Sequence, residues 1–73
     1  MKTILENAMI TYVKEMEKIS DRIRDAYSKA VEAAHRGDSI NYQKHSQSIT
    51  ELGDKLTEMK NELDKIKAAY AAI

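Results

Sequence analysis

The sequence predicts an all-α fold, an antiparallel two-helix hairpin of the coiled-coil type. Three observations predict it. The 73 residues include no Pro and only two Gly, and a third of them are charged, a composition that favours helix. Apolar residues recur at heptad spacing in both halves of the chain. The two patterns also match in register when the chain folds back at their one break. We expect a single domain over residues 1–73, with helix one at about 3–35, the turn at 36–38 and helix two at about 39–72.

The first helix is predicted from an apolar seam, the line of residues that faces the other helix. Thr3 is a plausible N-cap, and Glu6 three residues later completes the pattern of a capping box. A helix of this length spans ~50 Å. The seam residues are spaced alternately four and three apart, and they are Leu5, Met9, Tyr12, Met16, Ile19, Ile23, Ala26, Ala30 and Ala33.

The turn is predicted at Gly37. Gly readily takes the left-handed conformation that closes a helix, and Asp38 or Ser39 can accept the free N–H groups that open the next one. His35 and Arg36 fall in the last turn of helix one, where positive charge meets the negative end of the helix dipole. The chain is therefore expected to reverse direction over residues 36–38.

The second seam repeats the heptad spacing to the carboxyl terminus. When the chain folds back at Gly37, nine pairs of seam residues face each other, from Ala33 with Tyr42 to Leu5 with Tyr70, and the position numbers in each pair add to 75. Small residues cluster near the turn, so the helices should approach most closely there. The second seam comprises Tyr42, His45, Ile49, Leu52, Leu56, Met59, Leu63, Ile66, Tyr70 and Ile73.

His45 is the one basic residue in these seams, opposite Ala30. A single polar seam residue can specify register and oligomeric state at some cost in stability, and we interpret His45 as such a core register residue. Two alternatives stay open at this point. The side chain could reach solvent, or it could respond to pH or to a ligand, since histidine gains a charge in mild acid.

A chain this short buries little apolar surface on its own, so a second copy or another protein is expected to complete the core. One flank of the seam is poor in charge and mixes apolar with small polar residues. Gly53 supports an interface there, because Gly inside a helix is best explained by close approach of another backbone, the alternative being a tolerated surface Gly. The predicted interface comprises Val13, Ser20, Tyr27, Val31, Ser46, Thr50, Gly53 and Thr57.

The other flank offers an alternative dimer register. Arg22 lies beside Lys55 and Glu15 beside Glu62, and both contacts are mildly repulsive within one hairpin. In a two-fold dimer, Arg22 and Lys55 of one copy could lie against Glu15 and Glu62 of the other, and both contacts would then be attractive. Otherwise these residues form a solvated charged face.

Several classes of function are disfavoured by composition. Twelve basic and twelve acidic residues leave no net charge, which argues against nucleic acid as a partner. The chain has no cysteine, no apolar run of membrane-spanning length and no apolar core of a signal peptide. Glu32 and His35 have the spacing of a di-iron motif but fall outside the seam. We therefore expect no enzyme activity, no cofactor, no metal site and no membrane partner, in a cytoplasmic protein, with secretion without a cleaved signal left open.

In general shape the predicted hairpin is similar to the Rop-type plasmid regulators, which dimerise into four-helix bundles. It also looks like the hairpin needle subunits and small needle chaperones of type III secretion. It carries neither group's sequence motifs, and the Pro-rich turn of the needle subunits is absent. We expect a non-enzymatic interaction module, an adaptor, regulator or phage-type inhibitor, that self-associates into a four-helix bundle. The alternatives are a secretion-type chaperone or assembly subunit that binds an amphipathic helix of another protein and, less favoured, Rop-like RNA binding.

Overall fold

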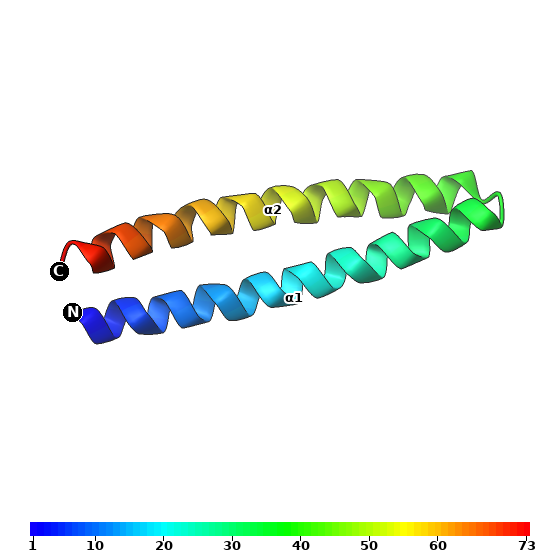
Figure 1. Ribbon diagram of the computed structural model, residues 1–73. Helices are drawn as coiled ribbons and strands as arrows, with labels where there is room; N and C mark the ends of the chain where they lie inside the picture. The colour runs from blue at the N-terminus through cyan, green and yellow to red at the C-terminus, as the bar shows by residue number, and fades with distance from the viewer.

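The computed structural model describes all residues from 1 to 73 and contains two helices, α1 (Lys2–His35) and α2 (Ser39–Ala71). The helices run antiparallel, with both chain termini at one end and the turn at the other (Figure 1). The molecule is a rod of 55 × 15 × 11 Å, and its radius of gyration of 16.5 Å exceeds the ~11 Å of a compact domain of this length. The predicted two-helix hairpin is confirmed.

The amino-terminal end of α1 differs from the prediction. Met1 occupies the N-cap position and no side chain caps the helix, so Thr3 lies inside α1 and the predicted capping box is wrong. The Glu6 carboxylate instead accepts a hydrogen bond from the Tyr70 hydroxyl at 2.9 Å, across the hairpin. The Lys2 ammonium lies 5.5 Å from the centroid of the Tyr70 ring, within cation–π range. The Glu6 hydrogen bond raises the pKa of Tyr70, and the two contacts tie the open end of the hairpin together.

The turn closes α1 with a Schellman motif. The Asp38 N–H donates to the Ala33 carbonyl at 2.9 Å and the Gly37 N–H donates to the Ala34 carbonyl at 3.2 Å. Gly37 has a φ of 70°, the left-handed conformation that a side chain would strain. The role predicted for Gly37 is therefore confirmed, and the chain reverses within three residues.

Asp38, rather than Ser39, is the N-cap of α2. Its carboxylate accepts one hydrogen bond from the Asn41 backbone N–H at 3.2 Å and another from the Asn41 side-chain amide at 2.6 Å. Because these bonds favour the charged carboxylate, they hold the pKa of Asp38 below its ordinary value of 3.8. The cap therefore stabilises α2 more strongly when Asp38 is ionised than when it is protonated.

We expect Asp38→Asn to remove part of the acid sensitivity of the hairpin. A group whose pKa is lowered by folding contributes stability above its unfolded pKa, and that contribution is lost as pH falls through the folded value. Asn caps a helix about as well as Asp but does not titrate in this range. Between about pH 5 and pH 2, melting followed by circular dichroism should therefore show a smaller loss of stability in Asp38→Asn than in the wild type. Asp38→Ala should be less stable throughout, and equal acid profiles for wild type and Asp38→Asn would contradict this role.

The core follows the predicted seam. Every seam residue of α1 is buried or half-buried, and so are the seam residues of α2 from His45 to Tyr70. Tyr42 and Ile73 are exposed, which corrects the expectation that they are covered. The alanines opposite Tyr42 are too small to cover its ring, and Ile73 lies beyond the end of α2. The buried residues are Ile19, Ala26, Ala30, Ala33 and Leu63.

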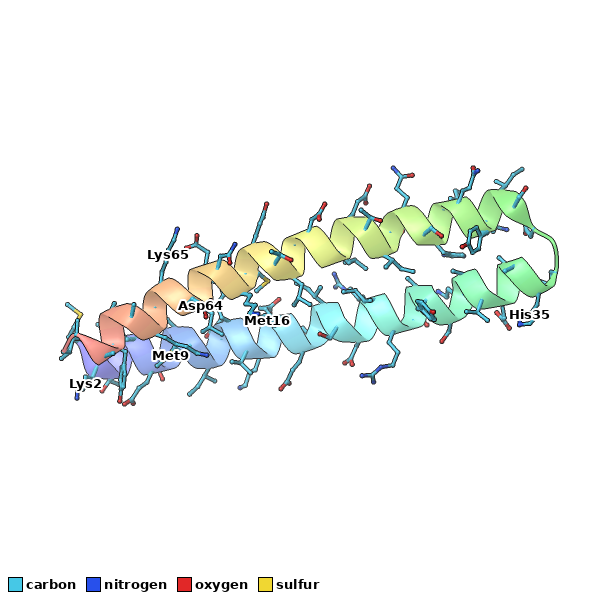
Figure 2. The ribbon with its side chains drawn as sticks, turned by 45° about the horizontal axis from the view of Figure 1, so that its top comes forward. Lys2, Met9, Met16, His35, Asp64 and Lys65 are labelled. Atoms are coloured by element: carbon cyan, nitrogen blue, oxygen red, sulfur yellow. The ribbon has the colours of Figure 1, made fainter.

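Charged side chains do not join the two helices. All four ion pairs lie within one helix, three or four residues apart, as between Lys65 and Glu62 at 3.2 Å. In Figure 2, Met16 lies between the helices whereas Lys65 projects outward from α2. The hairpin is therefore held by its apolar seam, the turn and the contacts of Tyr70. None of its helices is both long enough and apolar enough to cross a membrane.

Candidate protein interface

The predicted interface residues lie along one flank of the seam, and we call this surface the Gly53 face. It is the part of this flank that runs from Ile10 to Ala34 on α1 and from Ser39 to Thr57 on α2, and its residues share one side of the rod because they recur at helical spacing beside the seam. On α1 they are Ile10, Val13, Glu17, Ser20, Arg24, Tyr27, Val31 and Ala34, and on α2 they are Ser39, Gln43, Ser46, Thr50, Gly53 and Thr57. Beyond Thr57 the same flank of α2 continues with the charged residues Lys60, Asp64 and Lys67.

The α1 half of the Gly53 face exposes large apolar side chains. Four of the nine exposed large apolar residues of the chain lie on it: Ile10, Val13, Tyr27 and Val31. Tyr27 is 63% exposed although it lies eight residues inside the end of α1. Clusters of exposed apolar residues at one surface mark sites of protein interaction more often than isolated ones do.

A first groove crosses this face near the middle of the rod. It has a volume of about 340 Å³ and brings the predicted interface residues Val13 and Ser20 together. The groove has an apolar floor and a charged rim. Its lining comprises Val13, Met16, Glu17, Ser20, Asp21, Arg24, Leu56 and Leu63.

A second groove, of about 290 Å³, lies nearer the turn. It brings together three more of the predicted residues, Tyr27, Val31 and Ser46. The small alanine side chains in this region leave the space that the groove occupies. The remaining lining residues are Ala30, Ala34, His35, Tyr42 and Ile49.

The other three predicted residues, Thr50, Gly53 and Thr57, line neither groove and form the α2 strip of the face. The Thr50 hydroxyl donates to the Ser46 carbonyl at 3.2 Å, and the Thr57 hydroxyl donates to the Gly53 carbonyl at 3.0 Å. Both hydroxyl donors are thus satisfied by the helix itself. A partner could cover this strip without leaving them unpaired.

The structure shows no reason within the hairpin for glycine at position 53. A Cβ added to Gly53 would meet no atom within 4 Å. Close approach of α1 therefore does not explain this residue, which lies in the interior of α2, where Gly costs ~1 kcal/mol relative to Ala. Close approach of a backbone from outside the chain stays a prediction.

His45 lies half-buried in the seam, opposite the buried Ala30. No hydrogen bond joins its side chain to another residue of the hairpin. The structure thus places His45 in the seam, as predicted. The role itself stays a prediction.

The two glutamates of the opposite flank are paired within their own helices, whereas Arg22 and Lys55 form no ion pair. Glu15 pairs with Lys18 at 3.3 Å and Glu62 pairs with Lys65 at 3.2 Å. The repulsion predicted between Glu15 and Glu62 is therefore offset locally. A partner that paired with these carboxylates would have to displace lysines already in place, so the Gly53 face is the stronger candidate.

No group of three or more His, Cys, Asp or Glu side chains is placed to hold a metal ion. The two groups whose pKa values shift, Asp38 and Tyr70, have the structural partners described above. Comparison with protein-family models, with curated proteins and with solved structures finds no match.

Proposed function

We propose that this chain is a non-enzymatic protein-interaction module that self-associates through the Gly53 face into a four-helix bundle and acts as an adaptor, regulator or inhibitor. The observation that carries the proposal is the combination of exposed apolar residues and satisfied small polar residues on one side of the rod. Tyr27 and Val31 supply apolar contact area. Thr50 and Thr57 supply a surface whose hydroxyl donors are already bonded.

The thin core of the hairpin supports the same proposal. Only five of the 73 residues are buried, and three of these are alanines. Small domains with few buried side chains commonly gain the missing stability from oligomerisation. Stacking two hairpins face to face would cover the grooves and the apolar residues between them, as in four-helix bundles made of paired hairpins.

The non-enzymatic part of the proposal rests on the titratable groups. Catalytic acids, bases and nucleophiles usually have perturbed pKa values in a cleft. Here the shifts belong to Asp38 at a helix cap and Tyr70 at the chain ends, and neither residue lines a groove of the Gly53 face.

Sedimentation equilibrium with circular dichroism at micromolar concentrations tests self-association. The wild type should be a helical dimer or larger assembly, and Gly53→Glu, which places a charge on the face, should be mostly monomeric. Gln47→Glu adds the same charge to an exposed position of α2 outside the face and should associate like the wild type. A well-folded wild-type monomer at all concentrations would contradict the proposal.

A second candidate function is that of a chaperone or assembly subunit. The two grooves lie along one face of a rod, an arrangement that suits the spaced apolar anchors of an amphipathic helix from another protein. In that case the purified chain should be weakly associated and poorly ordered, and it should gain helix content when the partner segment is added.

A further inference from the structure

We propose that the second copy docks on the Gly53 face antiparallel to the first, with the two turns at opposite ends of the bundle and the two-fold axis at the level of Ser20 and Gly53. This inference rests on the proposed self-association and specifies its geometry. It also assigns a role to Glu17 and Arg24, the two charged residues of the α1 half of the face.

Ser20 and Gly53 share one level of the rod. Ser20 follows Ile19, which faces Leu56 in the seam, and Gly53 follows Leu52, which faces Ile23. Both therefore lie between the same two core layers, on the same flank, and both are half-buried. They mark the middle of the Gly53 face, and Ser20 also lines its central groove.

The charges of α1 are complementary under a two-fold rotation about this level. Glu17 lies three residues before Ser20, and Arg24 lies four residues after it. A second α1 running in the opposite direction would set its Arg24 against Glu17 and its Glu17 against Arg24. The rotation thus creates two identical ion pairs between the copies, as an isologous interface requires.

Both charges are available for this pairing. Glu17 forms no ion pair within the chain, and the Arg24 guanidinium reaches only Asp21, at 4.0 Å, with both of those side chains more than three-quarters exposed. Glu17 and Arg24 also line the same groove. The two ion pairs, each between Glu17 of one copy and Arg24 of the other, would therefore lie at this groove.

The apolar residues of α1 match under the same rotation. Ile10 lies ten residues before Ser20 and Val31 eleven after it, whereas Val13 and Tyr27 each lie seven residues away. The rotation therefore sets Ile10 against Val31 of the second copy and Val13 against Tyr27. All four are exposed in the single hairpin, so each apolar side chain would gain an apolar neighbour.

On α2 the rotation sets Gly53 against Gly53 of the second copy and Thr50 against Thr57. The absence of a side chain at the axis allows the two backbones to approach closely. The free space around the Cβ position of Gly53 is the space that such an approach would use. The threonine hydroxyls, bonded to their own helix, leave methyl groups for the contact.

The alternative stacking places both turns at the same end, with α1 over α2 of the second copy. Facing flank positions then set Ile10 against Asp64 and leave Glu17 between Thr57 and Lys60 of the second copy. Arg24 meets no carboxylate there. An apolar residue would thus face a charge and only one of the two charges of α1 would lie near an opposite charge, whereas the antiparallel arrangement pairs both, so charge complementarity favours the antiparallel arrangement.

Charge reversal tests the ion pairs. Glu17→Arg and Arg24→Glu should each weaken dimerisation about tenfold or more, because each turns two attractive contacts per dimer into repulsive ones. The double variant restores opposite charges and should dimerise within about threefold of the wild type. Glu58→Arg, at an exposed position outside the face, is the control and should have no such effect. Failure of the double variant to recover while the single variants are weakened would overturn the pairing, and so would unweakened single variants.

A distance between labels tests the orientation independently. The chain has no cysteine, so a spin label on Glu32→Cys is unique. Glu32 is twelve residues from Ser20, so each label lies ~18 Å from the two-fold axis, measured along the rod. In the antiparallel dimer the two labels lie on opposite sides of this axis and should be ~36 Å apart along the rod. When both turns are at the same end, the labels should be less than ~25 Å apart. A dimer with the short distance would overturn this inference and leave self-association standing. A wild-type monomer would overturn the proposed function and this inference together.

Discussion

Ile19→Ala should leave the hairpin largely unfolded at 37 °C. Ile19 is 3% exposed and is the most buried large side chain of α1, in the middle of the seam. Truncating a buried Ile to Ala commonly costs ~2–5 kcal/mol, which equals most of the stability that a core of this size supplies. Urea unfolding followed by circular dichroism at one low protein concentration would measure the loss.

The control for this change is Ile4→Ala. Ile4 lies in the same helix but is 68% exposed, so the same truncation should change the free energy of unfolding by no more than ~0.5 kcal/mol. If the two variants were equally stable, the seam would not be the core of the folded protein. If both unfolded, Ile4 would be covered in a larger assembly.

Gly53→Ala should affect folding and association in opposite directions. The added methyl group meets no atom within 4 Å in the hairpin, and Ala favours helix over Gly by ~1 kcal/mol. The isolated hairpin should therefore gain about that much stability at concentrations where it is monomeric. Between copies the methyl groups would separate two backbones at the axis, and dimerisation should weaken at least tenfold, or ~1.4 kcal/mol.

Asn61→Ala separates these two effects. Asn61 is exposed on α2 outside the Gly53 face, so this variant should gain helix stability without any change in dimerisation. Sedimentation equilibrium and urea unfolding on both variants would complete the comparison. Dimerisation of Gly53→Ala as tight as that of the wild type would show that the backbones do not meet at this residue.

The hairpin was predictable because its determinants are local or strictly periodic. Gly37 and Asp38 carry their conformational preferences in the residue itself, and both perform the expected roles in the turn. The heptad spacing from Leu5 to Ala33 requires no knowledge of the partner helix, since any helix that buries one stripe buries these residues. Residues that line one flank of this stripe could be placed on one face for the same reason.

The start of α1 was not predictable in the same way. Thr3 and Glu6 match a capping box, but that pattern considers only neighbours along the chain. In the folded hairpin, Tyr70 arrives from 64 positions away and donates to the Glu6 carboxylate. The capping-box pattern could not indicate this contact, because it includes only residues that are close together in the chain.

Exposure at the seam ends also depended on the tertiary structure. Tyr42 has the correct spacing for a core residue, yet it is exposed because the facing surface consists of small alanines. The two grooves of the Gly53 face also depend on the tertiary structure. Their volumes are set by the distance between the two helices and not by the periodicity of either helix.

The amino-acid sequence by itself therefore determined the two helices, the turn at Gly37 and the stripe that each helix buries, because these follow from backbone preferences and helical periodicity. The tertiary structure alone decided the contact between Tyr70 and Glu6, the exposure of Tyr42 and the grooves beside Ser20 and Tyr27. These features depend on side-chain volumes and distances between segments far apart in the chain, which exist only once the two helices have packed together.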